Sequence, residues 1–259
     1  MSTSTPAPGG DRNGGALEGA VVAVAGAGGP AGHATLLRLA EAGATVVAAD
    51  ADAERLAEGV DAARFAHGGA TVIGDTIDLL DPAAAREWAA KTEKDFGRVD
   101  GLVHLVGGWR GSASFAETDL ADWALLHDLL IRTVQHTSLA FEAPLTRSPN
   151  GRFVLISAAG ASRPTAGNAA YAAAKSAAEA WTLALGDSFR RTATDGPPSA
   201  AATIVIVKAL VSDAMRDARP GAAFAGFTDV RDLADAVCGL WDRPAEEVNG
   251  TRLWLTPQQ

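Results

Sequence analysis

Hydrophobic positions fall into two alternating patterns along the chain from Gly19 onward. One is a short run of β-branched and small apolar residues, typical of a strand that is buried on both faces. These runs predict strands over Ala20–Ala25, Thr45–Ala49, Thr71–Ile73, Gly101–Val106, Arg152–Ser157, Thr203–Val207 and Arg252–Leu255. The other pattern repeats apolar residues at helical spacing and predicts helices over Ala31–Glu41, Ala53–Phe65, Pro82–Phe96, Leu120–Phe141, Ala169–Arg191 and Val230–Trp241. Such an alternation predicts an α/β fold with one doubly wound parallel sheet of about seven strands and helices on both faces.

The length and the ends of the chain indicate its organisation. A chain of 259 residues fits one α/β domain, and it shows neither an internal repeat nor a linker. Residues 1–15 are rich in Ser, Thr, Pro and Gly and lack the apolar segment of a secretory signal, so we expect a disordered tail there. Residues 16–259 are then expected to form a single domain. No apolar run reaches the roughly 18 residues that a membrane span needs.

Charge narrows the range of expected partners. The chain carries 22 Lys and Arg against 31 Asp and Glu, a net charge of −9. Nucleic acids and anionic membranes select for clustered cations, so neither is an expected partner. Cys238 is the only cysteine, which excludes a disulfide within the chain, and its apolar surroundings predict a buried side chain. These features are typical of a cytoplasmic protein, and we predict no metal site.

A glycine-rich turn separates the first strand from the first helix. It runs through Gly26-Ala27-Gly28-Gly29-Pro30-Ala31-Gly32. Backbone N–H groups in such a turn meet a pyrophosphate at the positive end of the helix dipole. Pro30 suits the first helical position but removes one N–H donor. A plain connector is the alternative interpretation of this turn.

An acidic residue at the end of the second strand supports the interpretation of a dinucleotide site. Asp50 follows the glycine turn by about 20 residues, where a carboxylate binds the ribose hydroxyls of the adenosine. A carboxylate there repels a 2′-phosphate, and Ala51 and Gly29 leave no adjacent cation to accept one. The cofactor prediction is therefore NAD rather than NADP. Alternatively, Asp50 or Asp52 caps the next helix, a role that suits Asp52 better.

From Gly19 to Pro257 the chain resembles the short-chain dehydrogenase/reductase family, which implies a Rossmann-type fold and a single dinucleotide-binding and catalytic domain. The glycine turn matches the family's TGxxxGxG, His104-Leu105-Val106-Gly107 stands at its NNAG, and Tyr171-Ala172-Ala173-Ala174-Lys175 is its YxxxK. The cofactor-binding residues that this resemblance implies are Gly26, Gly29, Pro30, Ala31, Asp50, Asp78, Leu79, Val106, Gly107, Tyr171, Lys175 and Val211.

The YxxxK pair carries the predicted chemistry. Tyr171 and Lys175 lie on one helix face, so the ammonium group is near the phenol. A free tyrosine has a pKa of about 10, and a neighbouring cation is expected to lower this pKa toward neutrality. The resemblance implies that Tyr171 exchanges a proton with the substrate oxygen while Lys175 bonds the nicotinamide ribose.

Two catalytic positions of the family pattern are altered. The serine that lies thirteen residues before the tyrosine falls on Ala158, which leaves Ser157 as the candidate catalytic serine. Strand alternation points Ser157 the wrong way unless a bulge intervenes. The family asparagine, which kinks its helix and holds a water, falls on Leu130. A slower or differently connected proton relay is expected.

Other polar residues near the predicted site have two interpretations each. His104 either donates to a carbonyl or is a satisfied core histidine, and Thr165 and Asn168 either line the substrate side or serve the loop. Lys208 meets either the pyrophosphate or a surface acid. Ser212 is a candidate replacement for the family threonine that contacts the carboxamide.

The segment from Arg216 to Thr228 stands where the family keeps a mobile substrate lid. Together with this lid, Trp109, Met215, Phe224 and Phe227 predict an apolar substrate pocket, with plain packing as the alternative.

The leading hypothesis is an NAD(H)-dependent oxidoreductase that interconverts a small apolar carbonyl and its alcohol. One alternative is a catalytically degenerate NAD-binding regulatory or structural subunit, which the two altered positions favour. Another is a non-redox reaction, such as a dehydration or cyclisation, with Tyr171 as acid or base. The family resemblance also implies a homodimer or homotetramer, assembled through the helices Leu120–Phe141 and Ala169–Arg191.

Overall fold

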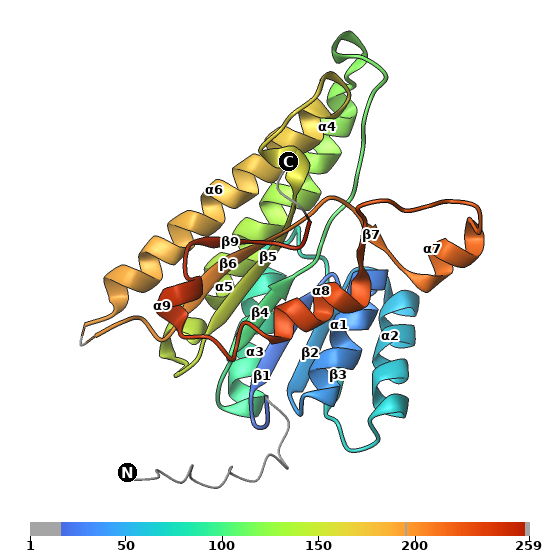
Figure 1. Ribbon diagram of the computed structural model, residues 1–259. Helices are drawn as coiled ribbons and strands as arrows, with labels where there is room; N and C mark the ends of the chain where they lie inside the picture. The colour runs from blue at the N-terminus through green and yellow to red at the C-terminus, as the bar shows by residue number, and fades with distance from the viewer. Residues whose placement is uncertain (1–16, 195, 257–259) are drawn as a thin grey trace, which may run out of the picture.

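The computed structural model describes residues 17–194 and 196–256, so the predicted tail over residues 1–15 lies outside the described residues (Figure 1). Seven parallel strands form one sheet in the order β3-β2-β1-β4-β5-β6-β9. They are β1 Val21–Ala25, β2 Thr45–Asp50, β3 Val72–Thr76, β4 Gly101–His104, β5 Arg152–Ala158, β6 Ala201–Val207 and β9 Thr251–Trp254. The predicted doubly wound parallel sheet is confirmed.

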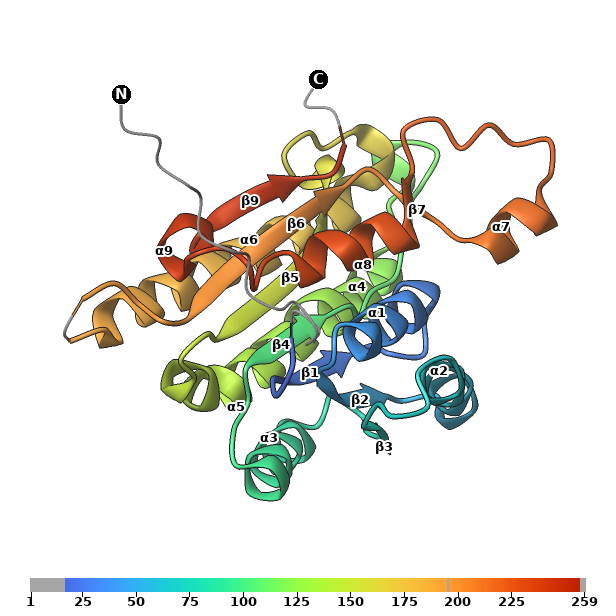
Figure 2. The ribbon, with the colours of Figure 1, turned by 60° about the horizontal axis from the view of Figure 1, so that its bottom comes forward.

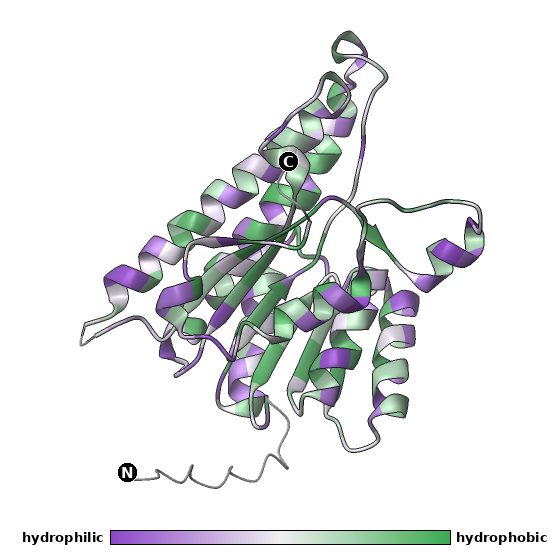
Figure 3. Cartoon of the chain, viewed as in Figure 1, coloured by the Kyte–Doolittle hydropathy of each residue, from purple (hydrophilic) through white to green (hydrophobic). Residues whose placement is uncertain are grey.

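Two layers of helices cover the sheet because its strands are apolar on both faces (Figure 3). Alternate strand residues belong to separate cores: Val22 and Val24 to one, Val21 and Ala23 to the other. The first core includes α1 (Pro30–Glu41), α2 (Ala53–Ala66) and α8 (Val230–Cys238), and α1 and α8 lie side by side (Figure 2). The second includes α3 (Pro82–Phe96), α5 (Thr133–Arg147) and α6 (Ala169–Thr192). Helices thus occupy both faces, as the strand patterns predict.

The strand order reverses between β1 and β4. From β1 the chain proceeds outward to β2 and β3, and it then crosses back to place β4 on the opposite side of β1. In open α/β sheets, ligands bind at this reversal, beyond the carboxyl ends of the strands. The topology therefore places a crevice next to the glycine turn.

The long helix predicted over Leu120–Phe141 is three segments. They are α4 (Leu120–His127), the π-helical segment η2 (Asp128–Arg132) and α5, which continues through Pro144 to Arg147. A π-turn accommodates one extra residue and leaves the apolar periodicity on either side intact. The pattern of apolar residues therefore did not reveal it.

Several short elements were not predicted. They are β7 (Leu210–Val211), β8 (Thr228–Asp229), α7 (Asp213–Ala218), α9 (Ala245–Val248), and the 3₁₀ turns η1 (Phe115–Glu117), η3 (Ala159–Ala161) and η4 (Ala166–Asn168). Segments of two to six residues are too short to display a hydrophobic period. Tertiary contacts define them instead.

Two further expectations concern single features. Cys238 is buried, as predicted, and burial raises the pKa of its thiol to about 12. Within residues 17–194 and 196–256, no helix has the length and apolar character to cross a membrane.

Candidate active site

A cavity of about 930 Å³ extends from the glycine turn after β1 to the first turns of α6. It brings together almost all the residues predicted for the site. Those that line it are Gly26, Gly29, Pro30, Ala31, Asp50, Asp78, Leu79, Val106, Gly107, Ser157, Tyr171 and Lys175. Val211 is not among the lining residues: it is 1% exposed and pairs with Asp229 in the short β7–β8 sheet. Leu210 lines the cavity in its place.

Two glycines of the turn are required by close approaches. A Cβ on Gly26, whose φ is +80°, would lie 2.6 Å from the backbone nitrogen of Val106. A Cβ on Gly32 would lie 2.3 Å from the carbonyl oxygen of Ala27. Gly26 therefore leaves room for the loop after β4, and Gly32 allows α1 to pack closely against the turn.

The N–H donors of the turn are partly committed within the protein. Those of Gly26 and Ala27 donate to the Ala49 carbonyl, and that of Gly28 donates to Asp50 Oδ2 at 2.8 Å. Pro30, at the first position of α1, has no N–H. The N–H groups that lack intrahelical acceptors begin with Ala31 in the first turn of α1. The donors available to a pyrophosphate are therefore the N–H groups at the start of α1 rather than those of the whole turn.

Asp50 lines the cavity next to the glycine turn, and its Oδ1 also accepts from the backbone N–H of Asp52 at 3.0 Å. Asp52 caps α2 by accepting from the backbone N–H of Arg55, as predicted. The expectation that no cation stands near Asp50 is wrong, because Arg55 also lines the cavity. Arg55 lies in the first turn of α2, which places it next to the cavity. Its Nε donates to Asp52 Oδ2 at 2.9 Å.

Tyr171 and Lys175 share the inner end of the cavity. The Lys175 Nζ lies 6.0 Å from the centroid of the Tyr171 ring and donates to the Ile156 carbonyl at 2.8 Å. Burial raises the pKa of Tyr171 to about 12. This is opposite to the expected lowering, because loss of solvent around the phenolate outweighs the nearby cation. Burial lowers the pKa of Lys175 to about 8, and Glu179 opposes that change.

The hydroxyl of Ser157 is directed to α6. Its Oγ donates to Glu179 Oε1 at 2.6 Å, and Glu179 Oε2 accepts from Arg252 Nε at 2.8 Å. The pairing of β5 with β6 continues without a bulge through Ala158, so normal alternation determines the direction of Ser157. In this arrangement Glu179 engages the Ser157 hydroxyl, while Ser157 still lines the cavity, and its role as the catalytic serine stays a prediction.

Leu130 is the residue that the family resemblance predicts at the position of the asparagine. It is 1% exposed and packs with Leu126, Ile131 and Ala174, and Tyr171 contacts the same cluster. The helix distortion expected from an asparagine is nevertheless present, as the π-helical η2. An apolar contact thus replaces the polar side chain at this point.

His104 is a satisfied core histidine, which confirms that interpretation. Its Nε2 lies 3.2 Å from Thr133 Oγ1 and its Nδ1 lies 3.1 Å from Thr137 Oγ1. Burial, followed by the charge of Lys175, lowers its pKa to about 3. His104 is therefore neutral, and it reaches the cavity only through Thr133, which lines the wall.

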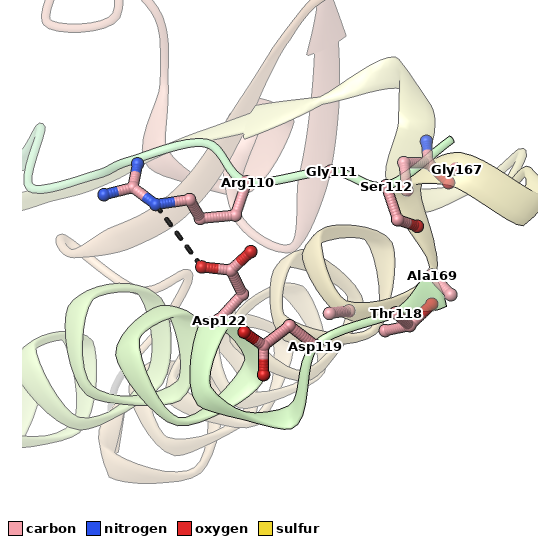
Figure 4. Close-up of a pocket in the computed structure, with 10 residues that line it drawn as sticks. Arg110, Gly111, Ser112, Thr118, Asp119, Asp122, Gly167 and Ala169 are labelled. Carbon is pink, nitrogen blue, oxygen red and sulfur yellow. Dashed lines mark ion pairs between the residues drawn. The ribbon is translucent and has the colours of Figure 1, made fainter. Parts of the chain in front are cut away.

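Two loops enclose the far end of the cavity. The loop after β4 contacts α4 through an Arg110–Asp122 ion pair of 3.5 Å (Figure 4). It also contacts the loop before α6, since the Ser112 N–H donates to the Gly167 carbonyl at 2.9 Å. Asn168 lines the cavity beside this contact, whereas Thr165 is not a lining residue.

The predicted apolar pocket is only partly present. Trp109 and Met215 line the cavity. Phe224 and Phe227 instead contact each other edge to face, with ring centroids 5.6 Å apart, and neither is a lining residue. Lys208 lines the cavity and donates from Nζ to the Ala225 carbonyl at 3.3 Å, so its predicted contact with a pyrophosphate stays a prediction.

The predicted lid segment, Arg216 to Thr228, begins within α7 (Asp213–Ala218), which stands away from the sheet (Figure 1). Arg216 donates from Nη1 to Asp229 Oδ2 at 2.6 Å, and Arg231 pairs with both Asp229 and Asp213. Ser212 caps α7 by accepting from the Met215 N–H. The ion pairs thus connect α7 to the start of α8.

Four polar residues lie in or next to the site although the sequence analysis missed them or left their role open. They are Arg55, Thr133, Asn168 and Glu179. Only Asn168 carried a signal, through its position three residues before Tyr171. The others approach the site from helix faces that no motif marks.

Comparisons with known proteins agree with this geometry. A family model described as short chain dehydrogenase matches residues 20–194. A (2S)-[(R)-hydroxy(phenyl)methyl]succinyl-CoA dehydrogenase subunit from Thauera aromatica is 31% identical over 169 residues, which are 65% of this chain and 66% of that protein. Across three curated relatives, the match spans between 62% and 66% of the relative's length.

Solved structures share the fold. A short-chain type dehydrogenase/reductase from Mycobacterium ulcerans superposes with a TM-score of 0.82 at 19% identity, over 93% of this chain and 89% of that one. An NAD⁺-bound xylitol dehydrogenase superposes with a TM-score of 0.80 at 20% identity, over 93% of this chain and 99% of that one. With its family-model match, its parallel sheet and its Tyr171–Lys175 pair, the chain belongs to the short-chain dehydrogenase family of oxidoreductases.

Proposed function

We propose that the protein is an NAD(H)-dependent oxidoreductase that interconverts a small apolar carbonyl compound and its alcohol. The observation that carries this proposal is one cavity that holds the glycine turn and Asp50 at one end and Tyr171 with Lys175 at the other. Its active site lacks the usual serine and asparagine, whose positions are Ala158 and Leu130. We place the whole activity in a single domain over residues 16–259.

The lining residues fit a dinucleotide along the length of the cavity. The start of α1 at Gly29, Pro30 and Ala31 would hold the pyrophosphate, and Asp50 would accept hydrogen bonds from the adenosine ribose. Asp78 and Leu79 would contact the adenine; Val106, Gly107, Leu210 and Lys175 would contact the nicotinamide end. When bound, the nicotinamide supplies or accepts the hydride.

Asp50 favours NAD over NADP. Its carboxylate repels a 2′-phosphate, while the Arg55 guanidinium is engaged with Asp52 rather than free to bind that phosphate.

Tyr171 acts as the proton donor for carbonyl reduction and as the acceptor for alcohol oxidation. With its pKa raised to about 12, the phenol holds its proton at neutral pH. The Lys175 cation stabilises the phenolate that remains after the proton leaves. Leu129 and Trp109 give this part of the cavity an apolar lining.

Two measurements test the proposal. Calorimetric titration with NADH and with NADPH should show binding with a clear preference for NADH. Turnover of a panel of carbonyls and alcohols should then depend on Tyr171, and Tyr171→Phe should abolish it. Full turnover in Tyr171→Phe with every active substrate would refute the catalytic assignment.

A second candidate function is an NAD-binding regulatory or structural subunit. Ala158, Leu130 and the engagement of Ser157 with Glu179 favour it. It predicts cofactor binding without turnover across the same panel, so the two measurements separate the candidates.

We also propose a homodimer or homotetramer. Exposed apolar side chains on the outer faces of α4 and α5 support it: Leu120 is 75% exposed and Leu139 is 68% exposed. Light scattering coupled to size exclusion tests this proposal, and a monomer at micromolar concentration would contradict it.

A further inference from the structure

Ala158 leaves the substrate oxygen without the donor that the family pattern supplies at that position. We propose that the side-chain amide of Asn168 supplies the donor, through a hydrogen bond from Nδ2 to the substrate oxygen. This inference rests on the proposed oxidoreductase function, in which Tyr171 exchanges the proton with the same oxygen.

Asn168 lines the same cavity as Tyr171 and precedes it by one helical turn. It ends η4 and immediately precedes α6, three residues before Tyr171. Residues separated by three positions at the start of a helix lie on the same side of it. Asn168, Tyr171 and Ala158 all line the same cavity.

The hydrogen bonds of Asn168 define the orientation of its amide. Oδ1 accepts from the backbone N–H of Thr165 at 2.6 Å, as one half of a capping box. A backbone N–H requires an oxygen acceptor, so this contact distinguishes Oδ1 from Nδ2. The amide nitrogen is therefore on the other side of the group, away from Thr165.

The amide nitrogen lies beside a residue that also lines the cavity. A Cβ built on Gly160 would lie 3.0 Å from Asn168 Nδ2, and Gly160 is the second residue after Ala158. Among residues 17–194 and 196–256, Nδ2 has no hydrogen-bond partner. The capping box uses only Oδ1, so it accounts for the oxygen of this side chain and leaves two N–H donors available.

An amide donor suits the proposed chemistry. Negative charge increases on the carbonyl oxygen as the hydride arrives, and a positioned donor stabilises that charge in the transition state. The amide keeps its protons across the working pH range, so its contribution does not titrate. The cap holds the side chain in place before substrate arrives, which reduces the cost of positioning it.

The decisive variant is Asn168→Asp. It keeps an oxygen for the Thr165 N–H and nearly the same shape, but it removes both donors. We expect kcat to fall by about 10²-fold, the usual effect of losing one such donor, while the calorimetric affinity for NADH stays within about twofold. Thr165→Val is the matched control, because it breaks the other half of the capping box and leaves the amide; its kcat should change by less than about threefold.

A rescue experiment separates donation from any effect of the new charge. Asn168→Ala should lose about as much kcat as Asn168→Asp, and adding Ala158→Ser should restore at least about tenfold by returning a hydroxyl to the family position. Turnover that depends on Tyr171 but stays within about threefold of wild type in both Asn168 variants would overturn this inference alone. A failure of Ala158→Ser to rescue a folded, NADH-binding Asn168→Ala would also overturn it. Absence of turnover in the wild type would overturn the proposed function together with the inference.

Discussion

Lys175 is a buried cation whose charge depends on its neighbours. Loss of solvent lowers its pKa to about 8, and Glu179, one helical turn further along α6, opposes the change. The other ionisable groups near it are Tyr171, the neutral His104 and Arg252, which pairs with Glu179. At neutral pH the lysine is charged, and it loses its charge in mildly alkaline solution.

We therefore expect kcat/KM for carbonyl reduction to fall as pH rises through about 8, because deprotonated Lys175 no longer stabilises the Tyr171 phenolate. Removing a negative charge near Lys175 with Glu179→Gln should move this fall to lower pH. The measurement is a pH profile of kcat/KM, with Lys91→Met, on the exposed face of α3, as the control. A profile that stays level from pH 7 to pH 10 would contradict the expectation.

The buried side chain of His104 makes the stability of the fold depend on pH in acid solution. Its pKa is about 3 in the folded protein, below the usual 6.5, so the unfolded chain binds a proton between these values that the folded protein does not. The stability that the neutral imidazole provides is present above pH 6.5 and is lost as pH falls toward 3.

Between pH 7 and pH 5 this loss amounts to about 2 kcal/mol, from a difference of about 1.4 kcal/mol per pH unit. Urea unfolding at both pH values should show that the wild type loses about 2 kcal/mol more than His104→Gln. Equal losses in the two proteins would indicate that His104 does not carry this acid sensitivity.

At the scale of elements, Glu179 connects β5, α6 and β9 by accepting from Ser157 and Arg252. The Glu179 side chain is 8% exposed, whereas that of Arg252 is 41% exposed. The hydrogen bond from Ser157 is therefore less exposed to solvent than the ion pair with Arg252. Its loss leaves the buried Glu179 carboxylate with one hydrogen-bond donor fewer.

Ser157→Ala should accordingly lower the free energy of unfolding by about 1–3 kcal/mol and change kcat by less than about fivefold. Denaturant unfolding and steady-state kinetics on the same preparation measure both. The opposite pattern, unchanged stability with a large loss of kcat, would show that Ser157 acts as the catalytic serine.

At the scale of the whole molecule, the cavity joins the two halves of the sheet. Asp50 ends β2 on one side of the strand reversal, whereas Tyr171 belongs to α6 on the other. A dinucleotide that fills the cavity contacts both halves and stabilises only the folded chain.

NADH at one hundred times its dissociation constant should thus stabilise the fold by about 2.7 kcal/mol and raise Tm by about 5–10 °C. Nicotinamide mononucleotide, which lacks the adenosine, serves as a comparison at equal concentration and should raise Tm less. Equal shifts with both ligands would show that the adenosine end of the cavity does not contribute.

The sequence by itself determined the parallel sheet, its order of elements and most of the residues that line the cavity. These features depend on local signals: apolar runs for buried strands, a glycine turn between strand and helix, and residues placed directly at strand ends. Gly26 and Asp50 are such residues, and parallel strands bring their carboxyl ends to one edge wherever the chain alternates in this way. Tyr171 and Lys175 lie within α6 and were identified by the YxxxK motif instead.

Only the tertiary structure decided which side chains face one another. It turned Ser157 toward Glu179, brought Arg55 back beside Asp50, and raised the pKa of Tyr171 where a lowering was expected. It also left the Asn168 amide beside Gly160 with its donors available. Each of these outcomes depends on contacts between residues distant in the chain, and hydrophobic periodicity and motif spacing do not identify the partners in such contacts.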